Sequence, residues 1–424
     1  MEYVRRVVDD ELDLLLPGIA AVAVEGAKAV GKTATAERRA ATVHRLDDPT
    51  QRAVIEADPT RLLAGTRPIL IDEWQRLPQS WDLVRRAVDA DSTGGQFILT
   101  GSATPAAAPT HSGAGRIVTV RMRPMTLGER GVGVPLVSLA ELLSGTRPPI
   151  SGTTDVGLER YAGEILASGF PGLRHLSERL LRAQLDGYLD RIVEHDFVEM
   201  GGYVIRNPAA LRKWLVAYAA AISTTASHET IRGAATDARG DRPARTTTQP
   251  YHDVLQRLWI VEPVPAWLPA RNWIARLTAP SKHQLVDPAL AARLLGVGAA
   301  ALLEGGPTGL PVPRDGTLLG ALFESLVTLG VRTFAQAAEA SVRHLRTQRG
   351  EHEVDLIVER DDGRVLAIEI KLKAAIVDRD VRHLLWLRDQ IRDDLLDAVL
   401  VTTGPEAYRR QDGVAVVPAA LLGP

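Results

Sequence analysis

Short apolar runs alternate with amphipathic stretches along the first 130 residues of the chain. The runs at 19–24, 68–71 and 96–99 are continuous and are bounded by Gly, Pro or polar residues, as in strands that are buried on both faces. Between them, residues 32–39 and 81–90 carry apolar positions at helical spacing. This alternation predicts an α/β domain with a parallel sheet covered by helices.

The middle of the chain is predicted to be mainly helical. A linker rich in Gly, Pro and Thr around 144–154 leads into three segments with helical spacing of apolar residues, at 161–167, 177–195 and 209–224. We therefore expect several helices to follow the first domain.

Residues 205–275 resemble a winged helix-turn-helix. An apolar helical stripe at 251–260 follows a polar segment whose arginines are Arg232, Arg239, Arg242 and Arg245. One interpretation is a module that contacts DNA, with these arginines on phosphates. The alternative is a protein-interaction domain or a solvated loop, because residues suited to reading bases are not evident.

The chain beyond residue 280 returns to an α/β pattern. We expect a short strand at 283–286 and a helix at 288–295, followed by a Gly- and Pro-rich break. The unit after the break is predicted as a helix at 318–329, strands at 341–346, 352–359 and 364–371, a helix at 378–391 and a strand at 398–402.

These patterns divide the chain into four predicted parts. They are an α/β part at 1–135, a helical part at 136–204, the winged-helix-like segment at 205–275 and an α/β module at 276–424.

The turn after the first strand has the composition of a phosphate-binding loop. Its form is G-x-x-x-x-G-K-[ST], made by Gly26, Ala27, Lys28, Ala29, Val30, Gly31, Lys32 and Thr33. Glycines allow the backbone N–H groups to point at phosphate oxygens, and the following helix adds its positive end. Lys32 is expected at the β- and γ-phosphates of ATP, and Thr33 at a Mg²⁺ ion.

Two further strands end in residues that suit the same site. The strand at 69–71 leads into Asp72 and Glu73, the pattern of a carboxylate near Mg²⁺ followed by one that orients or deprotonates the attacking water. The strand at 96–99 leads into Thr100 and Ser102, which we expect beside the γ-phosphate.

A second group of charged residues lies in the C-terminal unit. Glu369 and Lys371 are two apart on one predicted strand and so project to the same face, and a neighbouring strand brings Asp355 beside them. Glu324, on the preceding helix, completes an acidic cluster that could hold Mg²⁺. Lys371 is then placed to stabilise charge on a phosphate or to orient a water, which is the chemistry of phosphodiester hydrolysis.

The composition of the chain limits its possible partners, its chemistry and its cellular location. The chain has 424 residues and a formal net charge of −2, so only a local patch could attract nucleic acid. It contains no cysteine, which excludes disulfides, thiol catalysis and Cys-based zinc sites. The acidic start lacks the basic lead of a secretory signal, and the apolar run at 14–24 is too short to span a bilayer. We predict a soluble cytoplasmic protein with no membrane partner.

Lysine is scarce although the chain has 50 Lys and Arg residues together. The lysines are Lys28, Lys32, Lys213, Lys282, Lys371 and Lys373. Such lysines mark positions that need a compact ammonium rather than a planar guanidinium. Lys32 in the predicted phosphate loop is one of these lysines, and Lys371 in the C-terminal group is another.

With these residues in view, the chain resembles a widespread prokaryotic family of AAA-type ATPases with a C-terminal domain of unknown function related to PD-(D/E)XK nucleases. The strings that carry the resemblance are GAKAVGKT at 26–33, ILIDEWQRLP at 69–78, FILTGS at 97–102, GRIVTVRMRPMTLGE at 115–129, SGFPGL at 168–173, LDGYLDRIVEHD at 185–196, LQRLWIVEPVPAW at 255–267, HQLVDPALAARLLG at 283–296, GALFE at 320–324, EVDLIVE at 353–359 and AIEIK at 367–371. The resemblance implies a P-loop ATPase core at 1–135, a helical lid at 136–204, a winged-helix segment at 205–275 and a restriction-endonuclease-like module at 276–424. An Ala-rich loop at 103–114 departs from the pattern and leaves Arg116, Arg121 and Arg123 as candidates for a trans-acting arginine.

The leading hypothesis is an ATP-binding, Mg²⁺-dependent ATPase whose nucleotide state controls a nuclease-like module. One alternative is a nucleotide-dependent switch or scaffold without catalysis in that module. Another is a DNA-processing nuclease for which ATP is only regulatory. DNA, a protein partner and a second copy of the chain are the candidate partners besides ATP.

Overall fold

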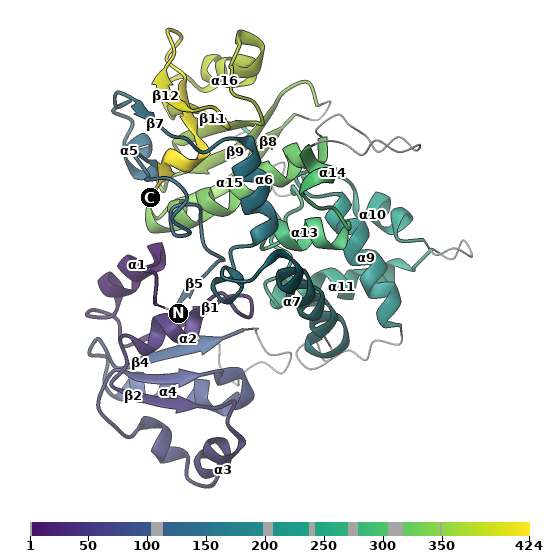
Figure 1. The fold of residues 1–424 in the computed structure, drawn as a ribbon. Coiled ribbons are helices and arrows are strands. Elements are labelled where there is room, and N and C mark those ends of the chain that lie inside the picture. Colours follow the sequence, from purple (N-terminus) through teal and green to yellow (C-terminus); the bar gives the residue numbers. More distant parts are fainter. Residues whose placement is uncertain are drawn as a thin grey trace.

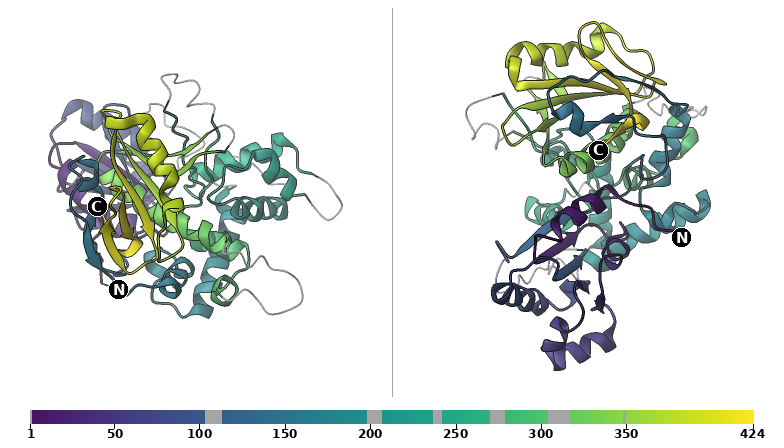
Figure 2. Two further views of the ribbon diagram at one scale, coloured as in Figure 1. Left: turned by 90° about the horizontal axis from the view of Figure 1, so that it is seen from above. Right: turned by 90° about the vertical axis from the view of Figure 1, so that its left-hand side faces the viewer.

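We describe a computed structural model of the chain over residues 2–102, 113–197, 207–236, 242–269, 279–303, 317–347 and 350–424. Figure 1 shows the N-terminal sheet at one end, the C-terminal sheet at the other, and helices from the middle of the chain at the side. The right-hand view of Figure 2 also shows the two sheets at opposite ends of the molecule.

The N-terminal domain contains the predicted parallel sheet. Its strand order is β2-β3-β4-β1-β5, and every neighbouring pair is parallel. The strands are β1 (Ala21–Glu25), β2 (Thr42–Arg45), β3 (Ile69–Asp72), β4 (Phe97–Gly101) and β5 (Ile117–Arg121). The helices are α1 (Val7–Leu15), α2 (Lys32–Glu37), α3 (Pro49–Ala57) and α4 (Gln79–Ala90). Parallel pairing brings the carboxyl ends of β1, β3 and β4 to one edge, where the predicted phosphate site lies.

Alternate residues of this sheet enter two different cores. One face packs against Trp74, which follows β3, and against apolar residues of α3 and α4 such as Ile55 and Trp81. The opposite face, with Val22 and Val24 of β1, belongs to a larger core that continues into the helical region and the C-terminal module. The continuous apolar strands in the sequence therefore reflect burial on both faces.

The helical region follows the predicted pattern. Its helices are α6 (Leu158–Ala167), α7 (Glu178–Arg191), a π-helical turn (Ile192–Asp196), α9 (Pro208–Ala220), α10 (His228–Ala234), α11 (Arg245–Arg257), α13 (Pro288–Leu294) and α14 (Ala299–Leu303). The strand predicted at 283–286 is wrong in detail. Two isolated bridges, Val261 with Leu285 and Val264 with Lys282, pair the backbone there without forming a strand.

The C-terminal module is a seven-stranded sheet in the order β7-β12-β13-β11-β10-β9-β8. Its elements are α15 (Thr317–Ala337), β8 (Ser341–Arg346), β9 (Glu353–Glu359), β10 (Val365–Lys371), α16 (Asp378–Ile391), β11 (Leu395–Thr402), β12 (Glu406–Arg409), β13 (Ala415–Pro418) and β14 (Leu422–Gly423). Strands β9 and β10 are antiparallel, and β10 and β11 are parallel. Helix α16 packs on one face of the sheet, and α15 packs on the other.

The linker predicted at 144–154 is wrong in its second half, which forms β7 (Ser151–Thr153). Just before the linker lie β6 (Val137–Ser138) and α5 (Leu139–Leu143). Strand β7 forms an edge of the C-terminal sheet by pairing with β12, and β6 pairs with β14 at the end of the chain. The first part of the predicted lid at 136–204 therefore packs with the C-terminal module.

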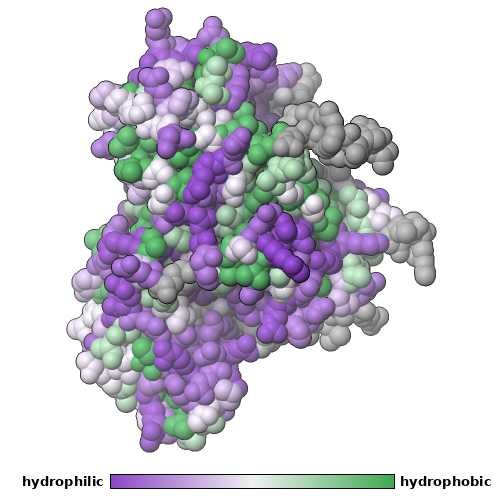
Figure 3. All heavy atoms as spheres, viewed as in Figure 1, coloured by the Kyte–Doolittle hydropathy of each residue, from purple (hydrophilic) through white to green (hydrophobic). Residues whose placement is uncertain are grey.

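Helix α15 is long and apolar enough to cross a membrane by length and composition alone, but 72% of its apolar window is buried inside the structure. It supplies core residues such as Leu322 and Phe323 beneath the C-terminal sheet. On the surface seen in Figure 3, hydrophobic residues occur in small groups among hydrophilic ones.

Candidate nucleotide site and C-terminal charged site

The loop between β1 and α2 has the backbone that a phosphate site requires. Gly31 has φ of 104°, in the left-handed region, and α2 begins at the next residue. A Cβ on Gly26 would lie 2.2 Å from the carbonyl oxygen of Met122, so a larger residue would displace one of the two segments. Both glycines are therefore needed for the path of the loop.

Lys28 contacts the helical region from within this loop. Its ammonium lies 2.6 Å from a carboxylate oxygen of Asp196 in the π-helical turn, and its carbonyl accepts a hydrogen bond from the Tyr188 hydroxyl at 3.2 Å. Lys28 was predicted as a nucleotide-binding residue. In this structure its side chain joins the loop to the helices instead, while its backbone remains in the loop.

Lys32 is buried at the start of α2. Its ammonium donates hydrogen bonds to the carbonyl oxygens of Gly26 and Ala27, each at 2.9 Å. Burial lowers the pKa of Lys32 to about 8, and the nearby Glu73 carboxylate opposes this effect. The ammonium is thus held over the loop that is predicted to surround the phosphates.

The tips of β3 and β4 meet the start of α2 as predicted. Asp72 Oδ1 accepts a hydrogen bond from the Thr33 hydroxyl at 2.8 Å and another from the Thr100 hydroxyl. A hydroxyl and a carboxylate side by side are the hard oxygen ligands that Mg²⁺ prefers. Thr33 and Asp72 therefore fit the metal that the sequence predicts at this site.

Glu73 has a left-handed backbone, with φ of 55° and ψ of 47°. Its carboxylate accepts hydrogen bonds from Ser102 at 2.8 Å and from the Gln75 amide. Backbone strain of this kind persists where surrounding contacts fix a residue in place, and it is common at active sites. The neighbouring residue Gln75 was not identified from the sequence.

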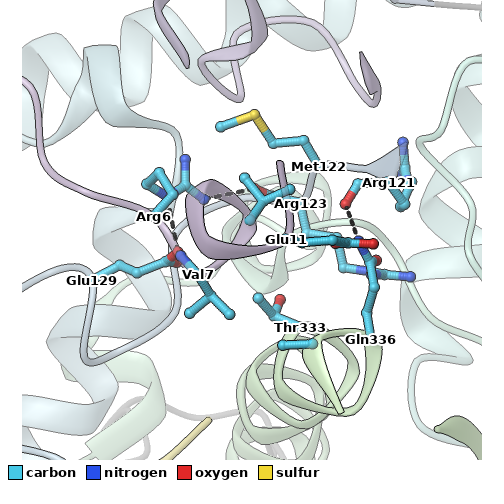
Figure 4. A pocket seen from close by; sticks show the side chains of 11 residues that line it. Arg6, Val7, Glu11, Arg121, Met122, Arg123, Glu129, Thr333 and Gln336 are labelled. Carbon is cyan, nitrogen blue, oxygen red and sulfur yellow. Dashed lines mark hydrogen bonds and ion pairs between the residues drawn. The ribbon is translucent and has the colours of Figure 1, made fainter. Parts of the chain in front are cut away.

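The N-terminal segment also supports the loop, a contact that was not predicted from the sequence. Figure 4 shows Arg6 beside Glu129 and Arg123. The Arg6 guanidinium donates to the carbonyl of Val30 at 3.0 Å and to that of Arg123 at 2.8 Å, and it pairs with Glu129 at 3.0 Å. Arg6 therefore joins the phosphate loop to the segment that follows β5.

A cavity of about 310 Å³ opens beside Gly31 and the first turn of α2. Its lining comes from the N-terminal segment, α2, the segment after β5 and the start of the helical region. Residues of this lining include Tyr3, Val4, Gly31, Ala34, Thr35, Met125, Pro171 and Arg174.

The three arginines considered for a trans-acting role have partners within the chain. Arg116 pairs with Asp89 at 2.8 Å. Arg121 lies 3.8 Å from the centroid of the Trp259 ring, and Arg123 pairs with Glu262 at 2.7 Å. A role for any of them toward a second subunit stays a prediction.

Glu262 is the centre of a buried cluster of arginines. Besides Arg123, its carboxylate lies 3.5 Å from Arg332 on α15 and 3.9 Å from Arg121 on β5. Gln336 of α15 accepts a hydrogen bond from Arg123 and donates one to the carbonyl of Arg121 (Figure 4). The cluster thus joins the edge of the N-terminal sheet to α15.

The predicted C-terminal residues also come together. Lys371 lies 2.5 Å from Glu369 on β10, and Asp355 on β9 accepts a hydrogen bond from the backbone N–H of Ile370 at 2.9 Å. Antiparallel pairing of β9 with β10 makes this arrangement, as the sequence predicted.

A residue that had been given no role lies at the centre of this group. The Lys282 ammonium is 2.8 Å from Glu324, 3.2 Å from Asp355 and 3.4 Å from Glu353. Its side chain has no exposed surface. The scarcity of lysine was the available signal, since Lys282 is one of the few lysines in the chain.

Two carboxylates of the group are hard to ionise. Burial and the nearby Asp355 raise the pKa of both Glu324 and Glu369 to about 8, although lysines oppose the shift. Among the described residues, no group of three or more His, Asp or Glu side chains is arranged to hold a metal ion. Glu324 and Asp355, which were predicted as metal ligands, contact the Lys282 ammonium.

Two of the arginines of the winged-helix-like segment contact the same acidic residue. Arg232 and Arg242 both pair with Glu229 of α10. Arg239 lies outside the described residues. A DNA-binding role for this segment stays a prediction.

Comparisons with known proteins agree with the nucleotide site described for the N-terminal domain. Residues 19–130 match a family described as an AAA domain. Residues 158–301 and 319–422 match two families described as domains of unknown function, DUF8612 and DUF4143. The matched AAA domain includes the loop, Lys32, Asp72 and Glu73, so the chain contains an AAA-type ATP-binding domain.

Two uncharacterized proteins are similar to most of the chain. They come from Mycobacterium bovis and Mycobacterium tuberculosis, and each is 27% identical over 369 residues, which is 86% of this chain and 71% of the relative. A Walker-type ATPase of Pyrococcus abyssi has 15% sequence identity and a TM-score of 0.38, over 68% of this chain and 94% of that structure.

Proposed function

We propose that the protein is a Mg²⁺-dependent ATPase whose nucleotide state controls the C-terminal module. The observation that carries the ATPase proposal is the meeting of Lys32, the Thr33–Asp72 pair and Glu73 at the ends of adjacent parallel strands. A phosphate-binding loop alone would bind nucleotide, whereas a second carboxylate beside it adds a means of activating water.

Each residue has a distinct role in this proposal. Lys32 and the loop N–H groups bind the β- and γ-phosphates, while Thr33 and Asp72 would hold Mg²⁺. The ion, when bound, would neutralise charge that develops on the phosphate. Glu73 accepts the proton of the attacking water, and Ser102 positions its carboxylate by a hydrogen bond.

Phosphate release by Glu73→Gln tests this function. Loss of a general base slows reactions by typically about 10² to 10⁴, so the variant should bind ATP and release phosphate far more slowly than wild type. Glu159→Gln, at an exposed position on α6, is the matched control and should match wild type. Equal release by Glu73→Gln would assign the role to another group, and no release by wild type would favour the switch or scaffold.

We also propose that the nucleotide base enters the cavity beside Gly31. The cavity adjoins the phosphate loop and has apolar walls from Val4, Met125 and Pro171. Ala34→Trp would fill it with a large side chain. This variant should weaken binding of ATP but leave binding of inorganic triphosphate unchanged, and an equal loss for both ligands would contradict this location for the base.

Control of the C-terminal module is supported by the contacts that surround α15. The buried Glu262 cluster connects β5, next to the phosphate-loop strand, with Arg332 of that helix. The same helix carries Glu324. We further propose that the protein is cytoplasmic. DNA is a candidate effector of the ATPase, and phosphate release measured with and without DNA would test this role.

A further inference from the structure

The C-terminal module holds a cation of its own among the residues that the sequence predicts as metal ligands. Lys282 lies within 3.4 Å of carboxylate oxygens from Glu324, Glu353 and Asp355, which come from α15 and β9. These oxygens surround one point, and the ammonium nitrogen occupies it.

The backbone fixes Lys282 at this point. Its N–H donates to the carbonyl of Val264 at 2.9 Å, and its carbonyl accepts from the N–H of Val264 at 2.8 Å. The side chain is fully buried, and it is delivered by a segment that lies outside the C-terminal sheet. An ammonium held in this way is a permanent feature of the site rather than a surface charge that solvent replaces.

We infer that Lys282 replaces the divalent metal ion in this module, so that the wild-type site does not bind Mg²⁺ or Mn²⁺. Carboxylate oxygens bind these ions at about 2.0–2.2 Å, which requires them to close around the same point that the ammonium nitrogen fills. Two cations sharing that space would repel each other strongly in a buried environment.

Two ammonium groups already lie among the carboxylates of this site. The site contains the carboxylates of Glu324, Glu353, Asp355 and Glu369 and the ammonium groups of Lys282 and Lys371. One oxygen of Glu369 is buried and has no hydrogen-bond partner in the described part of the chain. Removal of the Lys282 ammonium would therefore leave a cage of carboxylates with too little positive charge, to which a divalent ion should bind.

Two consequences follow for the module. It would not cleave a phosphodiester by a metal-dependent reaction. The cavity of about 420 Å³ that Glu353, Asp355, Glu369 and Lys371 help to line would act in binding instead. This inference concerns a site remote from the phosphate loop, and it holds whether or not the protein hydrolyses ATP.

Binding of Mn²⁺, followed by electron paramagnetic resonance of the free ion without nucleotide, tests the inference. All proteins carry Asp72→Asn, which removes the carboxylate of the ATP site. With Lys282 present, we expect no bound Mn²⁺ up to about 1 mM, the weak end of protein sites for divalent ions. Lys282→Ala should bind one Mn²⁺ per chain, and adding Asp355→Asn should remove it. Lys213→Ala, at an exposed position on α9, is the control and should bind none.

Stability measurements give a second readout. Lys282→Ala should lower the melting temperature, and Mn²⁺ should restore part of the loss in that variant but not in the Lys213→Ala control. Lys282→Met, which keeps the length of the side chain, serves if the alanine variant does not fold. The inference would be overturned if protein that retains Lys282 bound Mn²⁺ and if this binding disappeared when Asp355→Asn was added. A folded Lys282 variant that binds no Mn²⁺ would also overturn it.

Discussion

Replacement of Glu262 by glutamine is expected to destabilise the protein strongly. Glu262 follows Val261, whose backbone pairs with that of Leu285. Its carboxylate lies between three guanidinium groups, of which that of Arg123 is closest at 2.7 Å. Its side chain is only 16% exposed, and Arg332 has 9% exposure. The amide of glutamine would fill the same volume without the negative charge, so the arginines would lose their shared counter-ion.

The size of the effect follows from the burial of the cluster. Removing one partner from a buried ion pair costs about 3–5 kcal/mol, because the other charge remains uncompensated. The partial exposure of Glu262 admits some solvent screening, so we expect the lower end, about 3 kcal/mol. Arg332 also donates to the carbonyls of Glu262 and Pro263, at 2.6 and 2.7 Å, and these backbone contacts survive the substitution.

The effect should depend on pH with a definite sign. Burial alone would raise the pKa of Glu262, but Arg123, Arg332 and Arg121 outweigh it and hold the pKa well below its ordinary value. A carboxylate whose pKa is lowered on folding stabilises the native state above its unfolded pKa, about 4.3, and loses that contribution as the pH falls toward the folded value. The difference between wild type and Glu262→Gln should therefore be constant from about pH 5.5 to 8 and shrink below about pH 4.3.

Urea unfolding followed by tryptophan fluorescence provides the measurement, since Trp259 lies against Arg121 within the cluster. The midpoint for Glu262→Gln should fall well below that of Glu406→Gln, a control at an exposed position on β12. Midpoints are compared because a chain with several domains need not unfold in one step. Equal midpoints for the two variants at pH 7 would refute the reasoning and show that backbone carbonyls and solvent suffice to stabilise the arginines.

The other predictions concern the phosphate loop. Lys32→Ala should weaken ATP binding at least about tenfold in calorimetry, because a charge-assisted contact to phosphate is lost; unchanged affinity in a folded variant would exclude the proposed site. Gly26→Ala should destabilise by about 1–3 kcal/mol in thermal unfolding, since its Cβ would lie 2.2 Å from a backbone oxygen, whereas Gly18→Ala meets no atom within 4 Å and should be neutral. Asp196→Asn should free the partly exposed Lys28 and speed hydrogen exchange in the π-helical turn, at a cost of about 1 kcal/mol or less; unchanged exchange would show that this pair does not hold the turn.

The nucleotide site could be predicted because its signals are local. A strand, a glycine turn and a helix are consecutive in the sequence, and the strand tips at Asp72 and Thr100 each follow an apolar run. Parallel pairing then places these tips at one edge by a general rule of α/β sheets. The pairing of Asp355 with Glu369 and Lys371 was predictable for the same reason, since β9 and β10 are adjacent in the chain.

The remaining features depend on contacts between distant segments. Strand β7 pairs with β12, which lies more than 250 residues later in the chain, and nothing in the short polar sequence of β7 distinguishes it from a linker. Arg6 contacts the loop through carbonyl groups, which carry no sequence signature. Lys282 could be recognised as unusual by its residue type, but its position among three carboxylates requires the fold.

The two charged clusters share one piece of backbone. The N–H of Glu262 donates to the carbonyl of Gln284 at 3.0 Å, and two residues further along, Val264 and Lys282 exchange both of their backbone hydrogen bonds. A guanidinium nitrogen of Arg121 also lies 3.3 Å from where a Cβ on Gly26 would stand, at the start of the phosphate loop. Any shift of Arg121 on nucleotide binding would therefore act on Glu262, and through the paired backbone on Lys282. Because buried charges tolerate little displacement from their partners, this short path is the physical basis that we propose for control of the C-terminal module by the nucleotide.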